Sequence, residues 1–208
     1  MTASVSSAPA PAPRCSSSFA PRDELRDRLG VNGPTLAFAG RLTAQKSLGV
    51  ALDALAEVED VTLLIAGEGD ELEALRARAR ELGLNGRVRF LGAQPRERVF
   101  ELFRAADAAI LSSAWENFPH TVVEALAVGT PVLGTAVGGV AEVVRDGENG
   151  LLVPPGDPDA FAEALRRFLG DEELRERLRS HAQASVEHLR SERVYGELEQ
   201  ILERVAGS

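Results

Sequence analysis

The stretch from Thr35 to Val58 reads TLAFAGRLTAQKSLGVALDALAEV, which contains a short apolar run, a glycine turn and an amphipathic segment in that order. The apolar run is nearly continuous, as expected for a strand that is covered on both faces of a sheet. Beyond the turn, apolar residues recur at helical spacing and fall on one face: Leu48, Ala51, Leu52 and Leu55. A strand followed by a short turn and a helix predicts a βαβ unit, and such units build a parallel sheet.

The same alternation continues towards the end of the chain. Short apolar runs predict strands at Thr35–Ala39, Val61–Ala66, Val88–Leu91, Ala108–Leu111, Pro131–Leu133 and Leu151–Val153. Helical periodicity predicts helices at Ser47–Val58, Glu71–Leu82, Arg96–Ala106, Thr121–Val128, Val140–Arg145, Pro158–Leu169, Glu172–Glu187 and Glu192–Val205. The sequence therefore predicts an α/β fold, a Rossmann-like, doubly wound parallel sheet of about six strands with helices on both faces.

The bulk composition narrows the function classes. The chain has 208 residues, of which 44% are hydrophobic and 26% are charged, and its formal net charge is −9. A negative net charge argues against nucleic acid as the main partner. No apolar run is long enough for a transmembrane segment, and residues 1–13 lack the Lys and Arg of a signal peptide. The single cysteine, Cys15, excludes an intrachain disulfide and fits a cytoplasmic location.

The chain divides into two segments by composition. Residues 1–20 are rich in Ala, Ser and Pro, and they carry too little apolar surface to offset the entropy that ordering would cost. We expect residues 1–20 to form a disordered tail and residues 21–208 to form one domain.

Ligand-binding residues are expected in the loops beyond the carboxyl ends of the strands, as in other doubly wound sheets. The loop Gly40–Lys46 carries two cations, Arg41 and Lys46, at the entrance to a helix. Two cations together with the positive end of a helix dipole favour an anion, most naturally a phosphate. The alternative is that both are ordinary solvated surface charges, and we expect both side chains to be exposed. The glycine spacing fits neither a Walker loop nor a dinucleotide fingerprint.

Two carboxylates flank the start of a later helix. Glu116 lies in the loop after the fourth predicted strand, and the helix begins near Pro119. Glu124 lies within this helix and is the only formal charge between Asn117 and Ala141. A lone carboxylate among apolar residues either lines a cleft or has a dedicated partner, so a buried ion pair is the alternative to a ligand. In a cleft, Glu124 would accept hydrogen bonds from vicinal hydroxyls such as those of a ribose.

The spacing of these carboxylates resembles the E-x7-E pattern of retaining GT-B glycosyltransferases, particularly family 4. Glu116 and Glu124 enclose seven residues. Other segments resemble the same family in the same order along the chain: Gly40–Leu42 with Lys46, Leu63–Gly69, Val88–Gly92, Glu124–Val132, Gly138–Val144 and Asn149–Asp157. Each segment is weak evidence by itself, but several in order are specific. The chain therefore looks like the C-terminal, donor-binding domain of such an enzyme, over roughly Pro21 to Ser208.

The resemblance implies a nucleoside diphosphate sugar as the donor and a role for each matching residue. Arg41 and Lys46, in the loop that starts at Gly40, would neutralise the donor diphosphate. Glu124 would bind the ribose hydroxyls, and Glu116 would be the catalytic residue beside the donor sugar. The base would meet the stretch Arg89–Gln94 mainly through backbone groups, at Leu91 among others. The backbone amides of the loop and helix start would hold the sugar hydroxyls and phosphate at Asn117, Phe118, His120 and Thr121.

The reaction implied by the resemblance is transfer of a hexose with retention of configuration, without a metal or another cofactor. Two departures from the family pattern concern the site. Many relatives carry glycines after the first glutamate, where this chain has Asn117–His120. His120 either touches the donor or caps the helix. Ser47 stands where relatives often have glycine.

A GT-B enzyme has two Rossmann-like domains that face each other across a cleft, and the segment before Pro21 is too short to be the first of them. The expected partner is therefore an N-terminal GT-B domain or a partner subunit, and we expect this chain to be inactive without it. The location expected is cytoplasmic, with any contact to the inner membrane made through that other domain. Two alternative functions stay open: another GT-B enzyme such as a nucleotide-sugar 2-epimerase, and a non-catalytic interaction domain that keeps only the fold.

Overall fold

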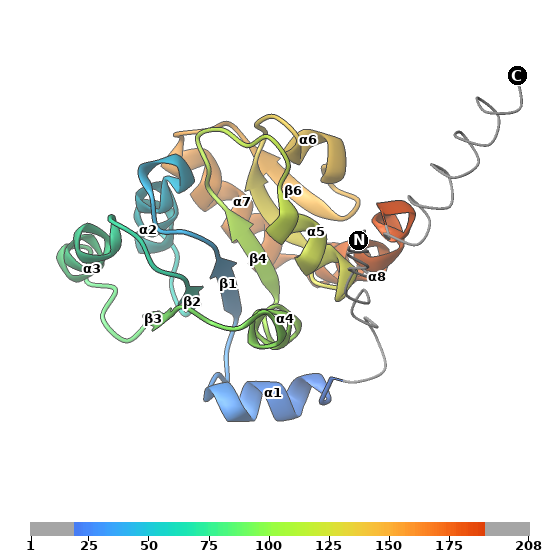
Figure 1. The fold of residues 1–208 in the computed structure, drawn as a ribbon, viewed down its shortest axis with the longest axis horizontal. Helices are drawn as coiled ribbons and strands as arrows, with labels where there is room; N and C mark the ends of the chain where they lie inside the picture. Colours follow the sequence, from blue (N-terminus) through green and yellow to red (C-terminus); the bar gives the residue numbers. More distant parts are fainter. Residues whose placement is uncertain (1–18, 190–208) are drawn as a thin grey trace, which may run out of the picture.

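Six parallel strands form one sheet in a computed structural model that describes residues 19–189 (Figure 1). The strands lie in the order β3-β2-β1-β4-β5-β6. Their bounds are β1 Thr35–Ala39, β2 Thr62–Ala66, β3 Val88–Gly92, β4 Ala108–Leu111, β5 Val132–Thr135 and β6 Gly150–Val153. All neighbouring strands pair in parallel. The predicted Rossmann-like, doubly wound sheet is confirmed, and each predicted strand exists within two residues of its predicted bounds.

Helices cover both faces of the sheet (Figure 1). Their bounds are α1 Arg22–Leu29, α2 Leu48–Ala56, α3 Leu72–Glu81, α4 Arg96–Ala105, α5 His120–Ala127, α6 Val140–Val143, α7 Pro158–Gly170 and α8 Glu172–Ser185. The helices α2, α3 and α7 bury apolar side chains on one face, α4, α5 and α6 do so on the other, and α8 contributes to both. The predicted helix Glu192–Val205 lies outside the described residues.

The helix α1 is absent from the sequence prediction, because it has almost no apolar face. Leu25 is its only buried residue, and most of its side chains are charged. Its Arg26 donates hydrogen bonds to the carbonyl oxygens of Gly33 and Ala105 at 2.7 and 3.0 Å. The helix is therefore held against the sheet largely by arginines, which a search for apolar periodicity does not detect.

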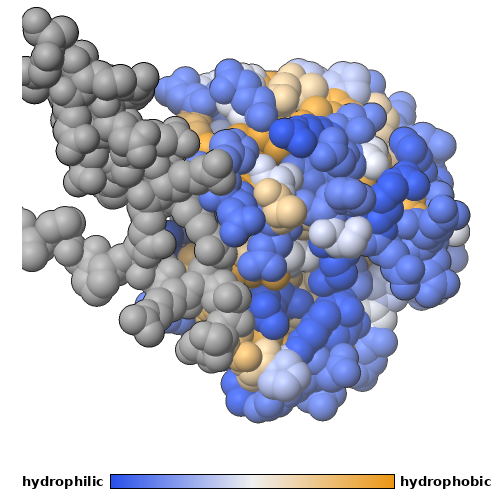
Figure 2. Space-filling model, turned by 90° about the vertical axis from the view of Figure 1, so that its right-hand side faces the viewer, coloured by the Kyte–Doolittle hydropathy of each residue, from blue (hydrophilic) through white to orange (hydrophobic). Residues whose placement is uncertain are grey.

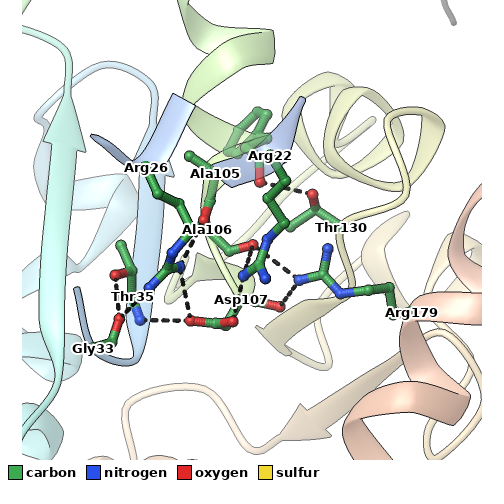
Figure 3. A network of polar contacts seen from close by, with 10 residues as sticks. Arg22, Arg26, Gly33, Thr35, Ala105, Ala106, Asp107, Thr130 and Arg179 are labelled. Carbon is green, nitrogen blue, oxygen red and sulfur yellow. Dashed lines mark hydrogen bonds and ion pairs between the residues drawn. The ribbon is translucent and has the colours of Figure 1, made fainter. Parts of the chain in front are cut away.

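Asp107 is the centre of the polar network that fixes α1 (Figure 3). Its carboxylate pairs with Arg22 and Arg26 and accepts a hydrogen bond from the Thr35 amide at 2.8 Å. Arg179 of α8 donates to the carbonyl oxygens of Ala106 and Asp107 at 3.0 and 3.1 Å. Burial, with added repulsion from Arg22, lowers the pKa of Arg179 to about 10. Since the network lies where β1 and β4 begin, it is at the opposite edge of the sheet from the expected site.

The surface shown in Figure 2 is mostly hydrophilic, with small hydrophobic patches between polar side chains. Scattered apolar residues of this kind are ordinary on a folded domain. Within residues 19–189, no helix has both the length and the apolar character needed to cross a membrane.

The strand order reverses between β1 and β4, and this reversal positions the site. From β1 the chain moves outwards to β2 and β3, and from β4 it moves outwards in the other direction to β5 and β6. The loops that follow β1 and β4 therefore leave the sheet towards opposite faces and open a crevice between them. Those two loops carry Arg41, Lys46 and Glu116.

Candidate functional site

Lys46 and Glu116 form an ion pair at the crevice, although they are 70 residues apart in the sequence. The Lys46 ammonium contacts Glu116 Oε1, and the Ser113 hydroxyl donates to the same oxygen at 2.7 Å. The side chain of Lys46 is 16% exposed and that of Glu116 is 7% exposed. The expectation that Lys46 is exposed was wrong, because Glu116 draws its ammonium into the crevice. Ser113 was missed, since a serine after a strand carries no distinctive sequence signal.

Hydrogen bonds join the loop after β1 to the loop after β4 on both sides of this ion pair. The Gln45 side chain donates to the Trp115 carbonyl oxygen at 3.0 Å, and the Ala114 amide donates to the Gln45 carbonyl oxygen at 2.9 Å. The Ser112 hydroxyl donates to the Lys46 carbonyl oxygen at 3.0 Å. The two loops therefore form one connected unit, which fixes the distance between the predicted phosphate loop and Glu116.

The loop after β5 packs closely against the backbone of the Glu116 loop. A Cβ atom at Gly138 would lie 1.9 Å from the Glu116 carbonyl oxygen, and one at Gly139 would lie 2.4 Å from that of Asn117. Gly138 also has a φ of +43°, which favours glycine. These glycines let two backbones approach closely, so contacts between bare backbones hold the Glu116 loop in addition to the side-chain contacts.

Arg41 lies on a cavity of about 370 Å³ at the carboxyl ends of the first three strands. The cavity is lined by Ala39, Gly40, Arg41, Ala66, Gly67, Glu68, Ala93, Gln94 and Val99. Its floor is apolar, and its rim carries the exposed Arg41 and the exposed carboxylate of Glu68. A flat apolar group with an anionic end fits such a cavity, because the floor contacts the flat face while Arg41 meets the anion.

Glu124 has a cationic partner that the sequence analysis did not single out. The Nε and Nη2 atoms of Arg96 both lie 3.0 Å from Glu124 Oε1. The Glu124 side chain is 22% exposed and that of Arg96 is 58% exposed. The alternative to a ligand-binding Glu124 was a buried ion pair. Glu124 does form an ion pair, but the pair lies at the surface rather than in the core. The carboxylate therefore stays accessible to a ligand.

The other predicted donor contacts lie around the start of α5. Asn117, Phe118 and His120 are exposed, Thr121 is half-buried, and the ring of Phe118 meets that of His120 edge to face. The His120 amide donates to the Phe118 carbonyl oxygen at 3.0 Å, so it is engaged within the chain. Trp115 and Phe118 are both exposed, and they place two aromatic rings on the Glu116 loop.

Residues predicted to contact the base line two neighbouring cavities. The side chain of Leu91 lines a neighbouring groove of about 210 Å³ between α1 and α4, together with Leu25, Leu29 and Leu102. Its carbonyl oxygen accepts a hydrogen bond from the Gln94 side chain at 2.7 Å. Gln94 lines the groove and the Arg41 cavity. Within the predicted base-binding stretch, Ala93 and Gln94 therefore line the Arg41 cavity.

Known proteins resemble this chain over most of its length. The family model for "Glycosyl transferases group 1" matches residues 21–185. The lipopolysaccharide core biosynthesis glycosyltransferase LpsE of Rhizobium meliloti is 37% identical over 148 residues, which cover 71% of this chain and 43% of that protein. The D-inositol 3-phosphate glycosyltransferase of Nocardia farcinica is 40% identical over 180 residues, which cover 80% of this chain and 39% of that protein.

Solved structures agree with the sequence matches. The crystal structure of Anabaena HepE in complex with UDP and glucose is similar with a TM-score of 0.80 and 30% sequence identity, and the match covers 90% of this chain and 52% of that chain. The chain thus spans about half the length of that protein, and less than half of the two curated relatives. Because the family model matches well over half of its residues, this chain belongs to the family of glycosyl transferases group 1.

Proposed function

We propose that this chain is the donor-binding domain of a retaining glycosyltransferase that transfers a hexose from a nucleoside diphosphate sugar to an acceptor. The observation that carries the proposal is the meeting of Lys46 and Glu116 at the reversal point of the sheet. A cation and a carboxylate at this point offer one group for the diphosphate and one for the sugar, at the place where doubly wound sheets bind nucleotides.

The roles follow from the positions of the side chains. Arg41 and Gly40 lie at the cavity and would hold the diphosphate with Lys46, while Gln94 and the backbone near Leu91 would meet the base. Glu116 would lie beside the donor sugar as the catalytic residue, and Glu124 would accept the ribose hydroxyls. The sugar would be surrounded by the residues at the start of α5: Asn117, Phe118, His120 and Thr121.

The Lys46–Glu116 pair suits a donor whose charge changes during the reaction. In the free protein, Glu116 neutralises Lys46 in a nearly buried position. A bound diphosphate would share Lys46 with Glu116, and the ammonium would then stabilise the negative charge that develops on the leaving nucleotide. Charge stabilisation by Arg41 and Lys46 would serve this step without a metal or another cofactor.

The nucleotide and the sugar are proposed from a relative. HepE forms complexes with UDP and glucose and with UDP-glucose, and its similarity covers 90% of this chain. We therefore propose UDP as the first nucleotide to test, with GDP second, and a hexose as the transferred group. A cytoplasmic location is part of the proposal, and the single cysteine of the chain fits it.

Transfer also requires an acceptor site. This chain spans 43% of LpsE and 39% of the inositol phosphate enzyme, so much of each relative has no counterpart in it. We propose that an N-terminal GT-B domain, on the same polypeptide or on a partner subunit, supplies the acceptor site and closes the cleft.

The experiment is a thermal-shift panel of UDP, GDP, ADP and their glucose or mannose conjugates, followed by calorimetry on the best ligand. The proposal expects saturable binding of at least one nucleoside diphosphate, and weaker binding of it by Arg41→Ala and by Lys46→Ala. Binding of none of them by the folded chain would favour the non-catalytic alternative and reject the proposal.

A further inference from the structure

Arg96 contacts only one of the two carboxylate oxygens of Glu124, among the residues that the structure describes. Two parallel donors of Arg96, Nε and Nη2, both lie 3.0 Å from Oε1 of Glu124. No hydrogen bond to Oε2 occurs within the part of the chain that the structure describes. A carboxylate has about four lone-pair positions, so two donors on one oxygen leave the other oxygen able to accept from a ligand.

The position of Arg96 is unfavourable for its own helix. Arg96 is the first residue of α4, where the positive end of the helix dipole repels a cation. Its guanidinium lies 5.3 Å from the centroid of the Phe100 ring, one turn further along the helix. Phe100 is buried, so this contact fixes the plane of the guanidinium against a rigid surface. From this fixed position on α4, Arg96 contacts Glu124 of α5.

We propose that Arg96 is a positioning residue, which orients the carboxylate of Glu124 so that Oε2 faces the ribose hydroxyls of the donor nucleotide. The inference rests on the proposed function, because it needs a nucleotide in the site. A flexible glutamate in a half-exposed position samples several rotamers, and ordering it on binding weakens the complex. A guanidinium stacked on Phe100 holds one rotamer in advance. Arg96 itself does not touch the ribose in this arrangement.

The experiment measures how strongly the protein prefers UDP over 2′,3′-dideoxy-UDP, by calorimetry on the full chain. Loss of Arg96 in Arg96→Gln should weaken UDP binding by about fivefold, the size of one net hydrogen bond, and leave dideoxy-UDP binding unchanged. Arg96→Lys keeps a cation and should restore part of the preference. Glu124→Gln removes the carboxylate and serves as the reference for complete loss of the preference for UDP.

Arg98→Gln is the matched control. Arg98 lies on the same helix and pairs with Glu101 at 2.5 Å, away from Glu124, so its removal should leave the preference unchanged. Equal weakening of both ligands in Arg96→Gln would mean that the pair only supports the fold, and tighter UDP binding would mean that Arg96 competes with the ribose. Either result overturns this inference and leaves the proposed function standing. Failure of the unaltered chain to bind any nucleoside diphosphate rejects the proposed function, and this inference falls with it.

Discussion

Lys46 would have two roles in the proposed site, whereas Arg41 would have only one of them. Both cations would contact the diphosphate, but only Lys46 also compensates a nearly buried carboxylate in the free protein. Removing one partner of such a pair leaves the other charge poorly solvated, which destabilises the fold. Removing a solvated cation such as Arg41 has little effect on folding.

Replacing either cation should therefore weaken nucleotide binding, but only the replacement of Lys46 should also destabilise the fold. Each of Lys46→Ala and Arg41→Ala should weaken nucleoside diphosphate binding by roughly 1.5–3 kcal/mol, the scale of hydrogen bonds to charged groups. Only Lys46→Ala should also lower the free energy of unfolding, by about 2 kcal/mol, because the Ser113 hydroxyl is then the one remaining side-chain partner of Glu116 among residues 19–189. Calorimetry and urea denaturation measure the two quantities. Equal stability of both variants would contradict the structural role of Lys46.

Ser47 explains one departure from the family pattern. Its φ is 45°, in the left-handed region, and it ends the 3-10 helix Ala44–Lys46 just before α2 begins at Leu48. The predicted helix start at Ser47 was therefore one residue early. Glycine adopts this conformation without strain, which fits the glycine that the family resemblance predicts at this position. The serine hydroxyl offsets part of the strain by donating to the Ala44 carbonyl oxygen at 3.0 Å.

The strain at Ser47 gives opposite expectations for two small substitutions. Ser47→Gly should raise the free energy of unfolding by about 0.5 kcal/mol, because relief of the left-handed strain exceeds the lost hydrogen bond and the added chain entropy. Ser47→Ala keeps the strain and loses the hydrogen bond, so it should lower stability by about 0.5–1 kcal/mol. Thermal unfolding of both variants beside the unaltered chain tests this, and two changes of the same sign would contradict it.

At the level of elements, the strands were predictable and the attachment of α1 was not. Each strand is a continuous apolar run, since both faces are covered, and that pattern is local in the sequence. The helix α1 depends on arginines that reach Asp107, about 80 residues away, and no local pattern records such a contact. The contacts within the candidate site were unpredictable for the same reason. Glu116, Lys46 and Glu124 were predicted singly, whereas the pairing of Lys46 with Glu116 and the contact with Arg96 required the fold.

The Asp107 network should matter more for stability than any other charged contact of α1. Asp107→Asn removes the charge that pairs with Arg22 and Arg26, and it leaves Arg179 among arginines without the nearby carboxylate that favours its charged form. We expect the free energy of unfolding to fall by about 2 kcal/mol, a value between those of exposed and buried pairs. The pKa of Arg179 should fall below its present value of about 10.

Urea denaturation is the measurement, and Asp53→Asn is the control. Asp53 pairs with Arg78 on the surface, where both side chains are well exposed, so its loss should change stability by less than about 0.5 kcal/mol. Nucleotide binding by Asp107→Asn should be unchanged while the protein stays folded, because the network is at the amino ends of β1 and β4. Weaker binding by the folded variant would show that α1 influences the site.

For the whole molecule, binding and transfer should be separable. The proposed donor site lies in this chain, whereas positioning of two substrates and exclusion of water account for much of the lowering of a transfer barrier. We expect the purified 208-residue chain to bind its nucleotide sugar weakly and to transfer no sugar. A fusion with an N-terminal domain from a relative should tighten donor binding and give turnover. Steady transfer by the isolated, monomeric chain in an acceptor panel would contradict this expectation.

The close backbone contacts of the site limit how it can be recombined. A Cβ atom at Gly67 would lie 1.8 Å from the Gly40 carbonyl oxygen, and one at Gly138 would lie 1.9 Å from that of Glu116. The loops after β1 and β2 are thus fitted to each other, as are those after β4 and β5. In a library of chimeras between relatives, a crossover that separates either pair will yield folded proteins only if both parents carry these glycines. Exchange of donor preference between relatives is therefore best attempted with each pair of loops moved as a single block.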